Sequence, residues 1–374
     1  MKNQISEFLQ SRIDAQDFPS AVYLVAEKGK IILQDALGFA VVEPEKIQAK
    51  VDTIYDLASL TKPLVTGLLC AKLIEREEIN LAGKIADYFE EFNTNEKREI
   101  TIENLLTHTS GFHAWKPFYL ITNFKSKIPN LIAAEPLENP PNKRVIYSDF
   151  NFLILGFLLE KIHSESLDNI AQKEIFTPLK LENTFFNPPK QLLKQIAASE
   201  NGNYYELQMA KEKGFNVGQK QVQNPKSKIQ NRTVWGEVHD GNCYYMNGVS
   251  GHAGLFSNAF ETFKMAQQFL ANQTKLLKPE TCDLFRTNFT KGFNEARSVA
   301  FQLAETKDST ASLALSKGSF GHLGFTGTSL WIDPSTERIF ILLTNRTHAR
   351  RLPFANINSV RRKFHGIVAK SIDE

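Results

Sequence analysis

The stretch "YDLASLTKPLVTGLLCAKLI", residues 55–74, is an apolar run that opens with a serine, a lysine and a proline. Apolar residues fill nearly every position from Leu64 to Ile74, so a helix here would be apolar on all its sides. We therefore expect a buried helix at the centre of the fold. Burial alone does not require Ser59, Lys62 or Pro63, so their presence at the helix start needs a separate explanation.

A catalytic role is one explanation for these residues at the helix start. If the helix begins at Ser59, Pro63 falls in the first turn, where backbone N–H groups lack intrahelical acceptors. Lys62 shares the face of Ser59, so its amine can reach the hydroxyl, and the positive end of the helix dipole would favour an alkoxide. Burial would lower the pKa of Lys62, which suits a proton acceptor. The alternative is a capping serine beside a solvated lysine, and Ser-x-x-Lys alone does not separate the two.

Strand and helix patterns on either side of this stretch predict the architecture. The first 16 residues have apolar residues at helical spacing, and residues 21–40 predict two strands around a turn at Lys28-Gly29. Strand patterns return at 321–334 and 338–347, and a last helix is expected from about Asn356. The segments between are mainly helical. Strands at both ends imply an antiparallel sheet built from both termini and flanked by helices, an α+β fold.

This pattern also suggests a domain organisation. Residues 1–75 and 300–374 are expected to form the sheet domain, and residues 76–299 a mainly helical inserted domain. Within the insertion, residues 212–233 are polar and contain glycine and proline, so we expect a mobile surface loop there.

Composition excludes several classes of function. The net charge is +3 and the one basic cluster, near the C-terminus, fits a solvated helix face, so nucleic-acid binding is not expected. Three cysteines form neither a zinc pattern nor a disulfide framework. No apolar run reaches the about 18–20 residues that cross a bilayer, and the N-terminus lacks a secretory signal. The chain reads as cytoplasmic, or periplasmic if a leader has been removed.

Two further motifs carry chemistry. "YSD", Tyr147 to Asp149, directly precedes a helical pattern, and "GHLGFTGT", residues 321–328, opens a strand pattern. Each has a structural reading as well: a serine or aspartate at a helix start is commonly a cap, a tyrosine or histidine can be core, and glycines can mark a bulge.

The three motifs and their surroundings together resemble the serine β-lactamase and penicillin-binding-protein superfamily, in the branch with class C enzymes, esterases and D-aminopeptidases. The resemblance runs from about Ala21 to the last helix. The segment "VHDGN" followed by "GVSGHAGLFS" further resembles a penicillin-binding-like subgroup of esterases or carboxypeptidases. Other matching blocks are "YDLASLTKP", "ITIENLLTHTSGF", "VIYSDFNFLILG" and "FTGTSLWIDPSTERIFILLTNR". The resemblance implies a β-lactamase/transpeptidase-like fold.

The resemblance also implies roles for particular residues. Ser59 would be the nucleophile that forms an acyl-enzyme, while Lys62 and Tyr147 would share the proton transfers. The backbone N–H groups of Ser59 and of Phe325, on an edge strand after Gly324, would form the oxyanion hole. Asp149 takes the place of the family's third-position Asn or Asp, and His322 that of the usual lysine.

Those last two residues leave the acid–base assignment open. A carboxylate at Asp149 would raise the pKa of Lys62 and oppose the effect of burial, and a neutral His322 would give Tyr147 less cationic help than a lysine. A Lys62–Asp149 ion pair with Tyr147 as base, or a cluster that shares one proton, are both compatible with the sequence. Because His322 lacks a permanent charge and Leu323 lacks a hydroxyl, we expect β-lactam hydrolysis to be slow or absent.

Other residues fit parts of these motifs. Tyr245 also fits a Tyr-x-Asn pattern and Lys317 precedes a Gly-Ser pair, but neither lies directly before the expected helix or strand. His108 is expected to be structural, as is His252, which has a possible place in the cleft. No metal site is expected at His239-Asp240, because adjacent strand residues point to opposite faces.

Two functions are therefore compatible with the sequence. The first is a serine hydrolase that acts on a small-molecule ester, amide or D-amino-acid peptide without a cofactor. The second is a penicillin-binding-like receptor or regulator that is acylated, or binds peptide, without turnover. The complete set of alcohol, amine and phenol favours the hydrolase.

Overall fold

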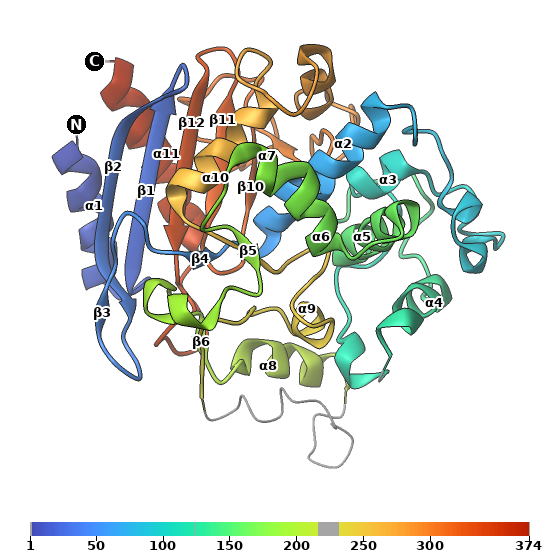
Figure 1. Ribbon diagram of the computed structural model, residues 1–374, viewed down its shortest axis with the longest axis horizontal. Helices are drawn as coiled ribbons and strands as arrows, with labels where there is room; N and C mark the ends of the chain where they lie inside the picture. Colours follow the sequence, from blue (N-terminus) through green and yellow to red (C-terminus); the bar gives the residue numbers. More distant parts are fainter. Residues whose placement is uncertain (1, 123, 216–231, 374) are drawn as a thin grey trace.

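A seven-stranded antiparallel sheet, in the order β3-β2-β1-β12-β11-β10-β9, organises the structure (Figure 1). The computed structural model describes residues 2–122, 124–215 and 232–373. The sheet's strands are β1 (Ser20–Glu27), β2 (Lys30–Val41), β3 (Ile47–Gln48), β9 (Gln302–Leu303), β10 (Phe320–Leu323), β11 (Ser329–Asp333) and β12 (Arg338–Thr344). At its centre β1 pairs with β12, from Ala21 opposite Thr344 to Glu27 opposite Arg338. The predicted α+β sheet built from both ends of the chain is confirmed.

Strand β1 is buried on both faces, and its side chains alternate between two cores. Val22, Leu24 and Ala26 belong to the large core shared with the helical part of the molecule, whereas Tyr23 and Val25 belong to a second, smaller core. This period of two is what the pleat of a strand imposes. The sheet is thus the middle layer of three.

The smaller core lies under the two terminal helices, α1 (Lys2–Asp14) and α11 (Ile357–Asp373), which pack beside each other on one face of the sheet (Figure 1). Ile5 and Leu9 of α1 are fully buried, as their helical spacing predicted. Phe364 of α11 meets Tyr23 edge-on at 5.9 Å between ring centroids. The other face of the sheet carries α10 (Ala259–Ala266) and the central apolar segment.

The central segment is helical and buried, but it does not begin as a regular α-helix at Ser59. It starts as a 3₁₀ turn, Ala58–Leu60, continues as a π-helix, Lys62–Gly67, and becomes α-helical only in α2 (Leu68–Glu75). The predicted buried helix is confirmed, with an irregular first part. Pro63 lies at the start of the π segment, where the missing N–H is tolerated. Short π segments occur frequently at functional sites.

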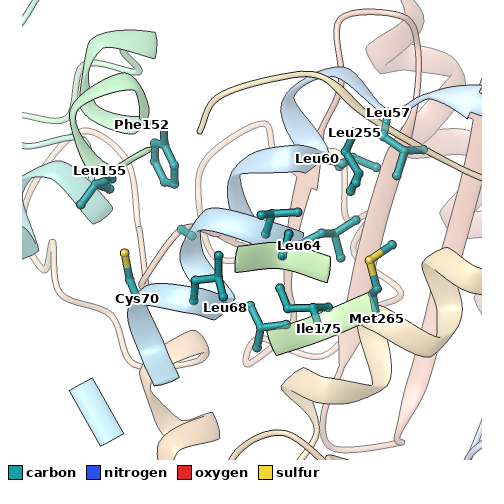
Figure 2. Close-up of a cluster of buried hydrophobic side chains, with 14 of the residues drawn as sticks. Leu57, Leu60, Leu64, Leu68, Cys70, Phe152, Leu155, Ile175, Leu255 and Met265 are labelled. Carbon is teal, nitrogen blue, oxygen red and sulfur yellow. The ribbon is translucent and has the colours of Figure 1, made fainter. Parts of the chain in front are cut away.

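Leucines of this segment pack against residues from several distant parts of the chain (Figure 2). Leu64 and Leu68 lie in one cluster with Phe152, Ile175 and Met265. One continuous core thus connects the sheet with the helical region. The domain boundaries expected at residues 75 and 300 stay a prediction.

The remaining elements surround this core. The helices are α3 (Ile102–Leu106), α4 (Ile128–Ala134), α5 (Asp149–His163), α6 (Leu167–Ala171), α7 (Thr177–Leu179), α8 (Tyr204–Glu212) and α9 (Gly241–Tyr245). Two small sheets join β4 (Tyr55–Asp56), β8 (Leu255–Ser257) and β5 (Phe185–Phe186), and β6 (Glu200–Asn201) with β7 (Thr233–Val234). Most of the loop expected at 212–233 lies outside the described residues. Within the described ranges no helix has the length and apolarity that a bilayer crossing requires.

The strand expected over residues 321–334 is a hairpin instead. Strands β10 and β11 pair from Phe320 opposite Ile332 to Leu323 opposite Ser329, and residues 324–328 form the turn between them. Gly327 has φ +108°, which a side chain would strain. Phe325 therefore lies in a turn, and β10 is not the sheet edge, because β9 pairs with it. The expected placement of Phe325 on an edge strand was wrong.

The close approach of Gly156 in α5 to Gly251 gives a prediction about stability. A Cβ on Gly156 would lie 2.9 Å from the backbone N of Gly251, whose carbonyl accepts a hydrogen bond from Thr66. Glycine to alanine inside an open helix stabilises by about 0.5–1 kcal/mol. Here we expect Gly156→Ala to lower the free energy of unfolding by about 1–3 kcal/mol, measured by urea denaturation. Gly318→Ala, where a Cβ meets open space, is the control; equal losses in both variants would contradict the packing argument.

Candidate active site

Ser59 lies in a tight turn that is fixed by a buried carboxylate. The preceding residue, Ala58, has φ +49°, a conformation that costs free energy for a residue with a Cβ. Its backbone N–H donates to Asp56 Oδ1 at 2.9 Å, and the other carboxylate oxygen of Asp56 accepts from the His239 backbone N–H at 2.8 Å. Burial raises the pKa of Asp56, against these hydrogen bonds. The carboxylate thus holds the strained turn that presents the hydroxyl.

The turn between β10 and β11 is tied to this same segment. Thr326 Oγ1 donates to the carbonyl of Asp56 at 2.9 Å, and Thr328 Oγ1 donates to the carbonyl of Leu57 at 3.1 Å. Gly324 leaves no room for a side chain, because a Cβ would lie 2.7 Å from the Leu57 carbonyl oxygen. The "GFTGT" motif therefore sets the distance between the turn that carries Phe325 and the one that carries Ser59.

Lys62 is fully buried and its ammonium contacts three oxygens. Its Nζ lies 2.9 Å from Ser59 Oγ, 2.7 Å from Asp149 Oδ1 and 3.2 Å from the carbonyl oxygen of His252. Burial disfavours the charged amine, but the carboxylate of Asp149 and the nearby Tyr147 outweigh it, so the pKa of Lys62 is raised. Lys62 is thus an ammonium at neutral pH. The sequence argument that burial would make it a free base does not hold once Asp149 is in place.

The chain at the "YSD" motif is hydrogen-bonded to the block "LLTHTSGF" and to the residues that follow it. The Ser148 N–H donates to His108 Nδ1 at 3.1 Å, the Ile146 N–H to the His108 carbonyl at 2.9 Å, and the Asp149 N–H to the Ala114 carbonyl at 2.9 Å. Ser148 also caps α5 by accepting from the Phe150 N–H. These bonds fix where the chain delivers the side chains of Tyr147 and Asp149.

Tyr147 is surrounded by charged and aromatic groups. Lys62 Nζ lies 5.0 Å and the Arg297 guanidinium carbon 5.5 Å from its ring centroid, and the imidazoles of His108 and His322 lie at 4.5 and 5.8 Å. Burial, together with the two cations, lowers the pKa of both imidazoles well below the usual value. Both histidines are therefore neutral, as expected for His322.

Three potential metal ligands come together next to the serine. One atom each of Asp149, Asp240 and His252 lies within 4.8 Å of the others. His252 Nε2 is 3.0 Å from Asp240 Oδ1, and the ammonium of Lys62 is 2.7 Å from Asp149. This ammonium already supplies positive charge to the group, so the absence of a metal stays our prediction. His252 is almost fully buried and contacts Lys62 from behind the cavity wall.

Ser59 lies where two cavities meet. Ser59, Tyr147 and Phe325 line both of them. The larger, about 450 Å³, is also lined by His322, Leu323, Gly324, Glu295, Gln302, Arg297, Arg346, Arg361 and residues 356–358. The smaller, about 210 Å³, is also lined by Ala58, Ala114, Trp115, Asp149, Tyr205, Glu206, Met209, His239, Asp240 and Ala253. The structure thus brings Ser59, Lys62, Tyr147, Asp149, His322, Gly324 and Phe325 together, although their roles stay proposals.

Comparison with known proteins identifies the family of this chain. The family model described as β-lactamase matches residues 5–360. The chain belongs to the β-lactamase family. Relatives provisionally named D-alanyl-D-alanine carboxypeptidase include one from Escherichia coli, 31% identical over 93% of this chain and 82% of its own length. Another, from Salmonella typhimurium, is 32% identical over 95% and 84%. Membership confirms the resemblance to the serine β-lactamase and penicillin-binding superfamily.

Similarity to solved structures confirms the fold. A penicillin-binding protein homolog from Caulobacter crescentus matches with a TM-score of 0.73 over 98% of this chain and 96% of its own, at 16% identity. EstCE1, a hydrolase with promiscuous acyltransferase activity, matches with a TM-score of 0.72 over 97% of both chains at 19% identity. A class C β-lactamase gives 0.72 over 98% and 97% at 13% identity. The predicted β-lactamase/transpeptidase-like fold is thereby shown.

Tyr245 and Lys317, the alternatives to Tyr147 and His322, lie elsewhere in this β-lactamase-family chain. Tyr245 ends α9 and lines a separate surface groove with Asn187 and Glu237. Lys317 is exposed before β10. Neither contributes to the two cavities at Ser59.

Sequence reasoning missed Arg297 and Glu295, which line the larger cavity. Arg297 is 5% exposed, and its Nη2 pairs with Glu295 Oε1 at 2.6 Å. The segment "NEARSVA" has no motif or periodicity that marks these residues. Only their position against Tyr147 identifies them.

The Lys62–Asp149 pair gives a prediction about stability in this family member. Asp149→Asn leaves a buried ammonium without its carboxylate, which typically costs about 3–5 kcal/mol. We expect a loss of this size in the free energy of unfolding at pH 7. Because the pKa of Lys62 is raised, the stabilisation linked to its ammonium is fully present at pH 7 and is lost as alkaline pH rises through the folded value.

The double variant Lys62→Met/Asp149→Asn is the control for this prediction. Removing both charges should recover most of the loss, because no unpaired charge stays buried. Denaturation in guanidinium chloride measures all three proteins. Additive losses in the double variant would show that the two groups are not coupled.

Proposed function

We propose that this chain is a serine hydrolase that forms an acyl-enzyme on Ser59 and releases a carboxylate-bearing leaving group, as a D-alanyl-D-alanine carboxypeptidase does. The observation that carries the proposal is the 2.9 Å contact between Lys62 Nζ and Ser59 Oγ in a cavity that Tyr147 also lines. A structural capping serine beside a solvated lysine does not account for this contact, because the ammonium is fully buried.

The charges favour Tyr147 as the base. Lys62 is held as an ammonium by Asp149, so it stabilises negative charge on Ser59 Oγ and on the phenolate oxygen. In the proposed acylation, the Tyr147 phenolate takes the Ser59 proton as Oγ bonds to the carbonyl carbon. The resulting phenol then returns that proton to the leaving group as the bond to the carbonyl breaks. In deacylation a water molecule gives a proton to the Tyr147 phenolate as it attacks the acyl carbonyl. The phenol then returns that proton to Ser59 Oγ as the acyl group leaves.

Two backbone N–H groups, of Ser59 and of Phe325, form the proposed oxyanion hole. Their turns are fastened to each other by the hydrogen bonds of Thr326 and Thr328. Preorganised donors of this kind stabilise the tetrahedral intermediate, and loss of one costs about 3–4 kcal/mol.

The charge of the larger cavity supports an anionic leaving group. Arg297, Arg346 and Arg361 line it, whereas Glu295 is its one acidic lining residue. Burial lowers the pKa of Arg361 to about 9, which leaves it cationic at neutral pH. The relatives provisionally named D-alanyl-D-alanine carboxypeptidase act, by that name, on a peptide with such a leaving group. This favours a peptide over a simple ester.

Slow or absent β-lactam hydrolysis stays part of the proposal. His322 is neutral and Leu323 has no hydroxyl, so neither provides the contacts of the usual Lys-Thr-Gly motif. The three arginines provide charge from other directions. Turnover of nitrocefin at the rate of a dedicated β-lactamase would contradict this part of the proposal.

A receptor that is acylated without turnover is the second candidate. Incubation with fluorescent penicillin separates the two: a stoichiometric burst that stops supports the receptor. Continuous release of D-alanine from a peptide substrate supports the hydrolase.

The first test is hydrolysis of diacetyl-L-lysyl-D-alanyl-D-alanine, followed by D-alanine release, with Ser59→Ala as the variant. We expect kcat/KM to fall by at least about 10³-fold in Ser59→Ala, because no nucleophile is left. Unchanged circular dichroism and thermal unfolding of the variant provide the control for folding.

A second peptide, identical but amidated at its C-terminus, tests the leaving group. If the arginines recognise the carboxylate, amidation lowers kcat/KM by at least about tenfold, equivalent to one charged hydrogen bond. Equal rates on both peptides, or turnover of p-nitrophenyl butyrate alone, would replace the carboxypeptidase assignment by an esterase.

A further inference from the structure

The base proposed for acylation lacks the cation that its motif normally supplies. Tyr147 must lose its proton to act, and a phenolate in a buried site needs positive charge nearby. The motif position that carries a lysine in related enzymes is His322, which is neutral here. Lys62 also stabilises the phenolate, but it shares its charge with Ser59 Oγ at 2.9 Å and with Asp149 at 2.7 Å.

A cation from outside the motifs occupies the other side of the ring. The guanidinium carbon of Arg297 lies 5.5 Å from the Tyr147 ring centroid, and the side chain lines the larger cavity with Ser59. Arg297 is 5% exposed, and its Nε has no hydrogen-bond partner among the described residues. A buried guanidinium with an unused donor at a cavity wall is costly unless it serves another group.

The backbone of Arg297 is anchored independently of its side chain. Its N–H donates to Thr290 Oγ1 at 2.7 Å, and its carbonyl accepts from the Phe289 N–H at 2.9 Å. The guanidinium is thus not needed to hold the loop. Among the described residues its side chain pairs with Glu295, whose Oε1 also accepts from Gln302 Nε2 at 2.6 Å.

We propose that Arg297 is a positioning residue that replaces the missing motif lysine and stabilises the Tyr147 phenolate. The inference rests on the proposed function of Tyr147. The other titratable or charged groups that face the ring are Lys62 from the π segment, Asp149 at the start of α5, His108 after α3 and His322 on β10. The two histidines are neutral and each cation has a carboxylate partner, so removing either member of the Arg297–Glu295 pair changes the net charge at the ring.

This charge balance predicts opposite effects for two neutral substitutions. Arg297→Gln removes positive charge and should raise the pH at which Tyr147 ionises. Glu295→Gln removes the counter-charge and should lower it. A purely structural role for the pair would make both variants less stable without moving the titration in opposite directions.

The kinetic test is the pH dependence of kcat/KM on the best substrate found for the wild-type protein. In Arg297→Gln we expect the acid limb to move up by about one to two pH units, and in Glu295→Gln to move down. Arg297→Lys keeps the charge and should restore most of the wild-type profile. The inference would be overturned if the acid limb of kcat/KM did not move in either glutamine variant, or if it moved in the same direction in both.

A second readout does not depend on activity. Tyrosinate absorbance in the near ultraviolet follows the ionisation of tyrosine. Titrating Ser59→Ala with and without Tyr147→Phe isolates the ionisation of Tyr147 from that of the other eight tyrosines. Adding Arg297→Gln to this background should shift the same titration upward. If the wild-type protein hydrolyses nothing but this shift occurs, the proposed function fails and the role of Arg297 stands. If hydrolysis occurs and the shift does not, only the role of Arg297 fails.

Discussion

The contact between a buried ammonium and a carboxylate is the constraint on which the site depends. Lys62 is enclosed by the core of the molecule, and an unpaired charge there would cost several kcal/mol. Asp149, at the first turn of α5, provides the opposite charge at 2.7 Å. Helix α5 must therefore start next to the π segment that carries Lys62. The position of Tyr147, two residues earlier, follows from this.

The surrounding structure holds these groups by hydrogen bonds between side chains and the backbone. The block around His108 clamps the chain before α5, and Asp56 holds the strained turn before Ser59. The turn after β10 is fastened to the same strand end by two threonines. Each of these segments comes from a different part of the chain. The proposed catalytic groups are thus positioned without substrate, as electrostatic stabilisation of a transition state would require.

The distribution of charge is where this chain departs from the usual motifs of its family. If His322 takes the place of the motif lysine, as proposed, that position is neutral, and the arginines that line the larger cavity come from the loop before β9, from the segment after β12 and from α11. Positive charge is therefore kept in the cavity but moved to other elements. Burial lowers the pKa of His108 and His322, and the nearby charges of Arg297 and Lys62 lower it further.

The sequence by itself determined the family and the α+β sheet built from both termini. It also predicted that Ser59, Lys62, Tyr147 and His322 share one site, because each lies in a motif with local spacing. It did not determine the protonation of Lys62, the turn that carries Phe325, or the presence of Arg297 beside Tyr147. The pKa of Lys62 depends on a balance between burial and Asp149, 87 positions later in the chain. Local patterns contain no information about such distances. Only the tertiary structure brings these charges together, and the free energy of a charge depends on what surrounds it in space.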